Sequence, residues 1–179
     1  GKWGYADRTG RVVIAPRFQR AGPFSEGLAA VEDGAVLGYV DVAGKLALVP
    51  GHAPKGVLHR PFSSGLAAVR VGQRYGYMDR TGKLAIGARF TTADDFSEGL
   101  AMACDPDGCG YVDPAGRGRV GYGFMGSAPV KGGVACVSLA MSMGRQRVAL
   151  RQVDGTAIPG EWEGCGSMSE GLIAVRLGG

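Results

Sequence analysis

Short apolar runs alternate with turn residues along the whole chain, at the spacing typical of β-strands joined by tight turns. In residues 3–7 and 11–15, apolar and aromatic residues flank a turn that runs from Asp7 to Gly10. In such a turn the aspartate bonds the backbone ahead of it, and the glycine supplies the positive φ that closes the turn. The pattern therefore predicts that the two segments pair as a β-hairpin.

A second turn links each hairpin to an apolar strand that precedes it. Residues 28–31 read Leu-Ala-Ala-Val and are separated from 37–41 by Glu-Asp-Gly at 32–34. Strands joined by such a turn are expected to pair. Apolar residues on both faces are typical of a strand that lies between neighbouring sheets. The predicted sheet therefore runs 28–31, 37–41, 45–49, from one repeat into the next.

These elements recur through the chain. The pattern Gly-Tyr-x-Asp-x-x-Gly begins at Gly4, Gly38, Gly76 and Gly110. A Phe-Ser-x-Gly-Leu-Ala block follows at 24–29, 62–67 and 96–101, with degenerate copies at 130–135 and 168–174. Self-similarity at a period of about 20 to 50 residues is the signature of a repeat architecture. We predict one repeat domain, 1–179, with five units at approximately 1–34, 35–72, 73–106, 107–145 and 146–179.

The repeated residues resemble the bacterial WG or KWG repeat family, whose pattern is Lys-Trp-Gly, an Asp-Gly turn and a Phe-Ser-Glu-Gly-Leu-Ala block. Lys2, Trp3 and Gly4 match the opening of that pattern, and the first and third units match best. The tryptophan position is Leu37 in the second unit and Cys109 in the fourth, and the last two units decay. The resemblance implies a binding or interaction repeat, with no catalytic motif to carry over.

The predicted fold class is all-β: five tandem β-meander repeats of about 34–38 residues. The chain opens with the second and third strands of a sheet, 3–7 and 11–15, and closes with a first strand at 172–177. If the ends meet, the last strand completes the first sheet, as in radial β-propellers. We therefore favour a closed, propeller-like arrangement, with an open β-solenoid as the alternative.

Composition and charge exclude several protein classes. The 33 glycines agree with short strands and tight turns, while 45% hydrophobic residues argue against disorder. The formal net charge of +4 is scattered over the sequence, so we expect no nucleic-acid partner. We expect no membrane span, because no stretch approaches about 18 apolar residues. The start at Gly1, inside a patterned segment, is typical of a mature or excised piece, and a leader could have been removed from it.

Three rows of side chains recur at fixed positions in the unit, and an aromatic row invites a reading as a groove for sugar or peptide. Apolar substitutes within each row favour core packing instead. The rows are Tyr5, Tyr39, Tyr77, Tyr111 and Leu150; Phe24, Phe62, Phe96, Val130 and Met168; and Leu28, Leu66, Leu100, Val134 and Leu172.

Three sets of polar residues invite a metal or catalytic interpretation. The first is the carboxylate row Asp7, Asp41, Asp79 and Asp113, which we interpret as turn formers because a calcium loop clusters its oxygens within about a dozen residues. The second is His52 and His59, which we place in a surface loop formed by the second unit's insertion. Glu26, Glu98 and Glu170 recur before a glycine, and nothing in the sequence pairs them as a general acid and base.

The four cysteines carry the most chemical information. Cys104 and Cys109 bracket Asp-Pro-Asp-Gly at 105–108, a type I turn signal that sets the two side chains opposite each other in a hairpin. We predict a disulfide there, the alternative being half of a zinc site. Cys136 and Cys165 either pair or are buried thiols. A disulfide implies an oxidising compartment, hence the periplasm or cell exterior; a cytoplasmic location stays open.

These observations favour a non-enzymatic, exported scaffold that presents loops or a groove to a protein or a cell-envelope polysaccharide. No catalytic residue, cofactor or metal is expected, and the ligand-binding residues are unknown. One alternative is a glycan-active enzyme with its site in a propeller channel, which requires two acids about 5 to 10 Å apart. Another is an accessory repeat array of a larger protein whose chemistry is encoded elsewhere.

Overall fold

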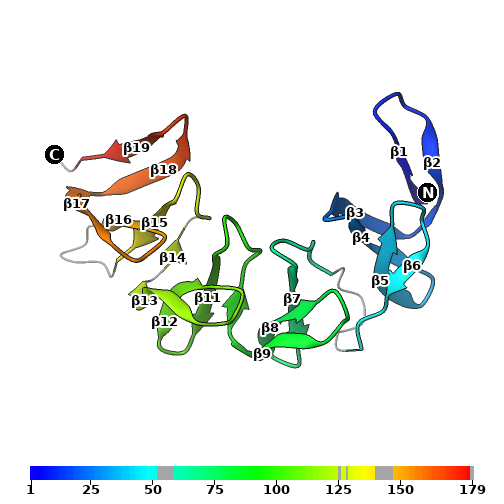
Figure 1. Cartoon of the computed structure of the whole chain (residues 1–179), viewed down its shortest axis with the longest axis horizontal. Helices are drawn as coiled ribbons and strands as arrows, with labels where there is room; N and C mark the ends of the chain where they lie inside the picture. The colour runs from blue at the N-terminus through cyan, green and yellow to red at the C-terminus, as the bar shows by residue number, and fades with distance from the viewer. Residues whose placement is uncertain (52–58, 125, 128, 140–146, 178–179) are drawn as a thin grey trace. The chain divides into compact units, whose positions relative to one another are not determined.

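In the computed structural model every regular element among the described residues is a β-strand (Figure 1), which confirms the all-β fold class. The structure describes residues 1–51, 59–124, 126–127, 129–139 and 147–177. The strands are β1 (Trp3–Ala6), β2 (Val12–Phe18), β3 (Arg20–Ser25), β4 (Leu28–Asp33), β5 (Val36–Asp41), β6 (Leu46–Leu48), β7 (Leu66–Val71), β8 (Arg74–Asp79), β9 (Leu84–Phe90), β10 (Thr92–Ala93), β11 (Ala101–Asp105), β12 (Gly108–Val112), β13 (Gly118–Phe124), β14 (Gly126–Ser127), β15 (Val134–Ser138), β16 (Val148–Gln152), β17 (Ala157–Trp162), β18 (Gly164–Ser169) and β19 (Leu172–Arg176).

The strands form small antiparallel sheets within two compact units, Gly1–Ala88 and Arg89–Gly179. The first unit contains the sheets β1-β2, β3-β4-β5-β6 and β7-β8 with most of β9. The second contains β10-β11-β12-β13, β14-β15-β16-β17 and β18-β19. The continuity of the array as one repeat domain, and its closure as a propeller, stay predictions.

Each four-stranded sheet contains the predicted meander and one strand that the sequence pattern did not predict. In the sheet β3-β4-β5-β6, the last three strands are the predicted run, and β3 adds a first strand that includes Phe24. The central register repeats: Ala30 faces Tyr39 in β4–β5, and Ala68 faces Tyr77 in β7–β8. Equivalent residues of successive repeats therefore pair in the same register.

The aspartate row forms turns, as predicted. Asp79 shows the pattern, because its Oδ1 accepts backbone hydrogen bonds from Thr81 (2.8 Å) and Lys83 (3.2 Å). The Thr81 hydroxyl donates to the same oxygen and holds the pKa of Asp79 below its ordinary value. Gly82 follows with a φ of +84°, a conformation that favours glycine. Asp7, Asp41 and Asp113 accept the equivalent backbone bonds.

The glycine that opens each of the first three repeats lies against the backbone of the next strand. A Cβ placed on Gly4 would be 2.4 Å from the carbonyl oxygen of Ile14. At Gly38 the corresponding atom is the carbonyl oxygen of Leu48, at 2.6 Å. The strand register shifts close to both glycines, as at a β-bulge. Close backbone approach therefore explains why glycine recurs at this position.

The core lies between successive sheets of each unit, because the central strands are apolar on both faces. Ala29 and Val31 of β4 pack toward Phe18 of β2, while Leu28 and Ala30 pack on the other side with Phe62. Tyr39, Tyr77 and Tyr111 are fully buried, and Leu150 is buried in the fifth repeat, which confirms these members of the row as core. Tyr5 is only partly buried and packs against the core of the first unit.

The leucine row is core in the first three repeats and not in the last. Leu28, Leu66 and Leu100 are buried, whereas 78% of Leu172 is exposed. The prediction that Leu172 is a core residue is therefore wrong. The difference has a local cause: Leu28 is covered by β5, whereas the described pairing of β19 is with β18 alone.

Candidate functional site

Successive repeats are joined by a serine and a glutamate that together bind the next repeat, a pair we call the Ser–Glu clasp. Ser25 Oγ donates to the carbonyl oxygen of Phe62 (2.5 Å), and the Glu26 carboxylate accepts from the amide of Gly65 (3.1 Å). The clasp comes from the turn between β3 and β4 and grips the corresponding turn of the following sheet. It lies within the first unit.

The same clasp recurs in the second unit, where the glutamate accepts hydrogen bonds from two backbone amides instead of one. Ser97 Oγ donates to the carbonyl oxygen of Val130 (2.8 Å), and the two oxygens of Glu98 accept from Gly132 (2.9 Å) and Gly133 (2.8 Å). The amide of Gly133, and then that of Gly132, hold the pKa of Glu98 below its ordinary value. The glutamates were singled out by recurrence alone; their role depends on which turn lies beside them in space.

We expect Glu98→Ala to lower the free energy of unfolding by about 1 kcal/mol, because an exposed carboxylate loses two charge-assisted hydrogen bonds. Urea unfolding followed by circular dichroism measures the loss. Glu161→Ala is the matched control, since that side chain is 86% exposed and pairs only with Arg147 among the described residues. Equal effects of the two substitutions would contradict the clasp.

Arginines form a second recurring joint. Arg17 donates to the carbonyl oxygen of Gly44 (2.6 Å), and Arg89 donates to that of Gly116 (2.7 Å). The guanidinium groups lie over the rings of Phe18 and Phe90, at 4.8 and 4.9 Å from the centroids. Each arginine therefore holds the aspartate turn of the next repeat. In the sequence, this joint is visible only as the recurrence of Arg-Phe before β3 and before β10.

The chain matches the WG containing repeat over residues 3–35, 75–105 and 156–179. The chain belongs to the WG-repeat family. Neither a curated protein nor a solved structure matches it. The unmatched segments include Leu37 and Cys109, where the tryptophan of the motif is replaced.

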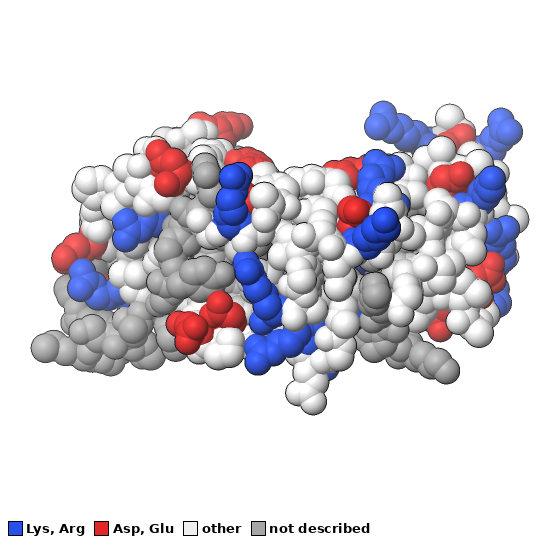
Figure 2. All heavy atoms as spheres, turned by 60° about the horizontal axis from the view of Figure 1, so that its bottom comes forward, with Lys and Arg blue, Asp and Glu red and all other residues white. Residues whose placement is uncertain are grey.

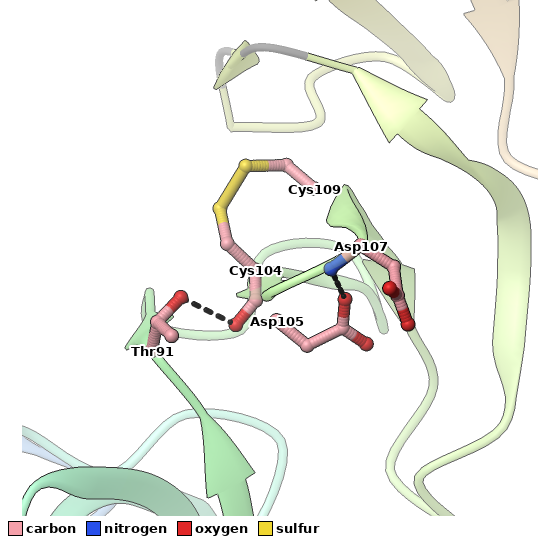
Figure 3. Close-up of a disulfide and its surroundings, with 5 residues drawn as sticks. All are labelled: Thr91, Cys104, Asp105, Asp107 and Cys109. Carbon is pink, nitrogen blue, oxygen red and sulfur yellow. Dashed lines mark hydrogen bonds between the residues drawn. A yellow bond between two sulfur atoms is a disulfide. The ribbon is translucent and has the colours of Figure 1, made fainter.

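At the junction of the third and fourth units, a disulfide joins the paired strands β11 and β12 (Figure 3). Cys104 and Cys109 are direct partners in the antiparallel register, with their Cα atoms 3.9 Å apart. Asp105 accepts from the amide of Asp107 (2.9 Å) in the turn between them, and the Thr91 hydroxyl donates to the carbonyl oxygen of Cys104 (3.1 Å). The two cysteines bind each other rather than zinc.

A second disulfide links Cys136 of β15 to Cys165 of β18, with Cα atoms 6.2 Å apart. It closes a longer segment of chain, since the two cysteines are 29 residues apart in sequence. The fourth unit lacks the serine and glutamate of the clasp, because Lys131 and Gly132 stand in their places. This disulfide therefore joins two successive repeats where the clasp residues are missing.

The two histidines of the second repeat have different outcomes. His52 lies outside the described residues, and the prediction that His59 lies in a surface loop is wrong: its side chain is buried and stacks on Tyr39 at 5.4 Å. Burial lowers the pKa of His59, against a hydrogen bond with the Leu37 backbone that raises it, and its Nε2 has no partner among the described residues.

His59 should make stability depend on pH. Because its folded pKa lies below the unfolded value of about 6.5, the unfolded chain binds more protons as the pH falls. Its contribution is therefore fully present above that value and is lost as the pH decreases through the folded pKa. We expect urea midpoints to fall between pH 7.5 and pH 5 more steeply in the wild type than in His59→Gln. Parallel profiles would contradict this.

A row of exposed apolar side chains, one per sheet, lies on the edge strands of the first unit. It comprises Val12 of β2 (57% exposed), Leu46 of β6 (45%) and Leu84 of β9 (36%), which we call the edge row. Each member is the second residue after the turn glycine, so the recurrence was visible in the sequence. There these residues were interpreted only as part of a β-strand. Apolar side chains exposed at a recurring position are candidates for partner contact.

A small cleft lies beside this row. It has a volume of about 100 Å³ and is lined mainly by apolar residues, with Arg17 and Asp33 as its charged groups. Ligand pockets usually measure about 300 to 1,000 Å³, so this cleft suits a single side chain rather than a sugar ring. Among the described residues, no three His, Cys, Asp or Glu side chains gather as metal ligands do.

The charged side chains of the described surface are mixed in sign. Figure 2 shows Lys and Arg interspersed with Asp and Glu on the face drawn, without the continuous basic stripe typical of nucleic-acid binding. No helix in the described part of the chain is long and apolar enough to cross a membrane.

Proposed function

We propose that this chain is a non-enzymatic WG-repeat scaffold that binds a protein or a cell-envelope glycan. One observation carries the proposal: the polar side chains that recur from repeat to repeat bind the protein's own backbone. Asp79 closes a turn, Glu98 grips the next repeat, and Arg89 holds the next turn. A hydrolytic site needs carboxylates that face a substrate, whereas these carboxylates are engaged in holding the array together.

The edge row is the surface we assign to partner contact. Its side chains are exposed and apolar, and they recur once per sheet of the first unit. The small cleft beside Leu46 has room for one side chain of a partner. An extended surface of this kind suits a partner with its own extended or repeating structure.

We place this function in an oxidising compartment, the periplasm or the cell exterior. Two disulfides support the placement, because cytosolic thiols are kept reduced. The arrangement of the sheets, closed propeller or open solenoid, belongs to the same proposal. The two differ in whether β19 completes the sheet of β1 within one chain.

To test this, the disulfide-intact chain is immobilised and two probes are measured for saturable binding to it. The probes are solubilised cell-envelope polysaccharide and an envelope protein extract. We expect one of them to bind, and Leu46→Lys to weaken that binding by about tenfold or more. Val153→Lys is the matched control, an apolar residue exposed to a similar degree to Leu84 but outside the row. Turnover of a substrate by protein that binds neither probe would overturn the proposal.

A further inference from the structure

The positive charge of the protein is concentrated in its first unit. Residues 1–88 contain 12 Lys and Arg against 6 Asp and Glu, whereas residues 89–179 contain 8 against 10. The formal net charge is therefore +6 for the first unit and −2 for the second, although charges of both signs lie on the face drawn in Figure 2. Because opposite charges attract over the surface of a protein, an anionic partner is drawn to the first unit.

Every carboxylate side chain of the first unit already has a partner within the protein. Glu26 is held in the Ser–Glu clasp, and Asp33 pairs with Arg17 (3.6 Å). Glu32 pairs with Arg20. The other three carboxylates accept backbone hydrogen bonds in the turns: Asp7, Asp41 and Asp79. The cations that remain are therefore not compensated by a neighbouring acid.

The uncompensated cations lie at the aspartate turns. Each is exposed, and no hydrogen bond or ion pair joins its side chain to another described residue; we call them the basic row, Arg8, Arg11, Lys45, Arg80 and Lys83. Three of them directly follow the turn glycine of successive repeats: Arg11, Lys45 and Lys83. In the fourth repeat the equivalent residue is Arg117, which pairs with Asp113 (2.9 Å). The exposed, unpaired cations therefore belong to the first unit.

The turns that carry the basic row follow one another in the same way from repeat to repeat. A Cβ placed on Gly44 would lie 3.0 Å from Ile14 of β2, and one on Gly82 would lie 2.8 Å from Leu48 of β6. Ile14 and Leu48 are equivalent, since each is the fourth residue after the turn glycine of its own repeat. Each turn is thus seated on the edge strand of the preceding repeat. Because packed sheets lie about 10 Å apart, the cations recur at steps of that size.

We propose that the basic row binds an acidic polysaccharide in which charged sugars alternate with neutral ones. The spacing of charge favours this class of polymer. Duplex nucleic acid carries one charge per about 1.7 Å, and an extended acidic peptide carries one per about 3.3 Å. Both are denser than cations at steps of about 10 Å, whereas alternation with neutral sugars spreads the carboxylates more widely. The proposal goes beyond the proposed function, because it does not depend on the edge row.

Binding of this kind depends on several repeats acting together. An exposed ion pair between a cation of the row and a carboxylate contributes little by itself. A polymer that engages three successive turns adds these small contributions within one complex. Exposed charges are screened by salt, so the affinity should decrease steeply as the ionic strength rises.

The test uses hyaluronan, a polymer in which a carboxylate-bearing sugar alternates with a neutral sugar. Its binding to the disulfide-intact chain is measured by titration calorimetry at low ionic strength. We expect saturable binding that weakens as sodium chloride is added. The methyl ester of hyaluronan, which has lost the negative charges, should not bind.

A triple variant locates the binding on the row. Arg11→Ala, Lys45→Ala and Lys83→Ala together should lower the affinity by about tenfold or more. The matched control removes three exposed cations from the second unit, Lys131→Ala, Arg147→Ala and Arg176→Ala, and should leave the affinity within about twofold. Urea midpoints show whether both variants remain folded. If the first triple variant loses stability, Lys45→Glu replaces it and should weaken binding, whereas Lys45→Arg should retain it.

Four outcomes would overturn the proposal. The first is no binding of hyaluronan, and the second is equal binding of its methyl ester. The third is an equal loss of affinity in the control triple variant, which would reflect net charge alone. The fourth is equal or tighter binding of polyglutamate or duplex DNA at the same concentration of charges, since the spacing would then be irrelevant. Leu46→Lys should not weaken hyaluronan binding, because it adds a cation beside Lys45, so the proposed role of the edge row is tested separately.

Discussion

Gly76→Ala should destabilise the chain by about 3 kcal/mol, because the added methyl group has nowhere to go. A Cβ on Gly76 would lie 2.5 Å from the carbonyl oxygen of Ile86 and 2.9 Å from the backbone nitrogen of Ala88. These are backbone atoms of β9, the paired strand, so relief requires the strand itself to move. Urea unfolding monitored by circular dichroism measures the loss.

The same sheet provides the control for this substitution. Gly87 lies in β9, with open space where its Cβ would be placed, so Gly87→Ala should be neutral or stabilise by about 0.5 kcal/mol through a more restricted unfolded chain. If the two variants unfold at the same urea concentration, close backbone approach is not the reason for the glycine in the WG motif.

Tyr39→Ala should lower the free energy of unfolding by about 3 to 5 kcal/mol, as large-to-small core substitutions of aromatic residues do. The ring is fully buried, contacts Phe62 at 4.9 Å and His59 at 5.4 Å, and its hydroxyl donates to the Arg60 carbonyl oxygen at 2.6 Å. Denaturant unfolding measures the effect.

Tyr39→Phe separates packing from hydrogen bonding at the same position. It keeps the ring and removes the hydroxyl, so we expect a loss of about 1 to 2 kcal/mol, from an acceptor left without its donor. If Tyr39→Phe instead leaves stability unchanged and weakens binding of the partner, the tyrosine row is a binding groove and its assignment to the core is wrong.

Local features were predictable from the sequence because their chemistry lies within a few residues. Asp79 and Gly82 form one turn by bonds to neighbours two and four residues away, so spacing alone identifies them. The tyrosine row was assigned to the core because Leu150 replaces tyrosine in the fifth repeat, and Leu150 is buried in its place.

Features that depend on a neighbouring repeat were not predictable in the same way. Glu98 and Arg89 recur in the sequence, but their partners at Gly132 and Gly116 are 34 and 27 residues away, and only the structure brings them together. His59 was misplaced because a Pro-rich insertion reads as surface loop, whereas its ring is buried against Tyr39. Leu172 was misplaced because a row position was taken to guarantee a neighbouring strand.

The repeated joints also explain why the edge row is the better candidate for function. Glu98 and Arg89 bind the backbone of the next repeat, so these side chains are already engaged within the array. Val12, Leu46 and Leu84 face solvent, and their exchange leaves the joints intact. If the edge strands bind the partner, as proposed, its specificity can change there while the joints between repeats stay the same.

The proposed location in an oxidising compartment rests on the two disulfides. The most direct measurement is a thiol count on protein isolated from its source without reductant and denatured in the presence of a thiol reagent. We predict no reactive thiol before reduction and four after it, since Cys104 pairs with Cys109 and Cys136 pairs with Cys165. Four free thiols before reduction would contradict both disulfides and, with them, a scaffold that works outside the cytoplasm.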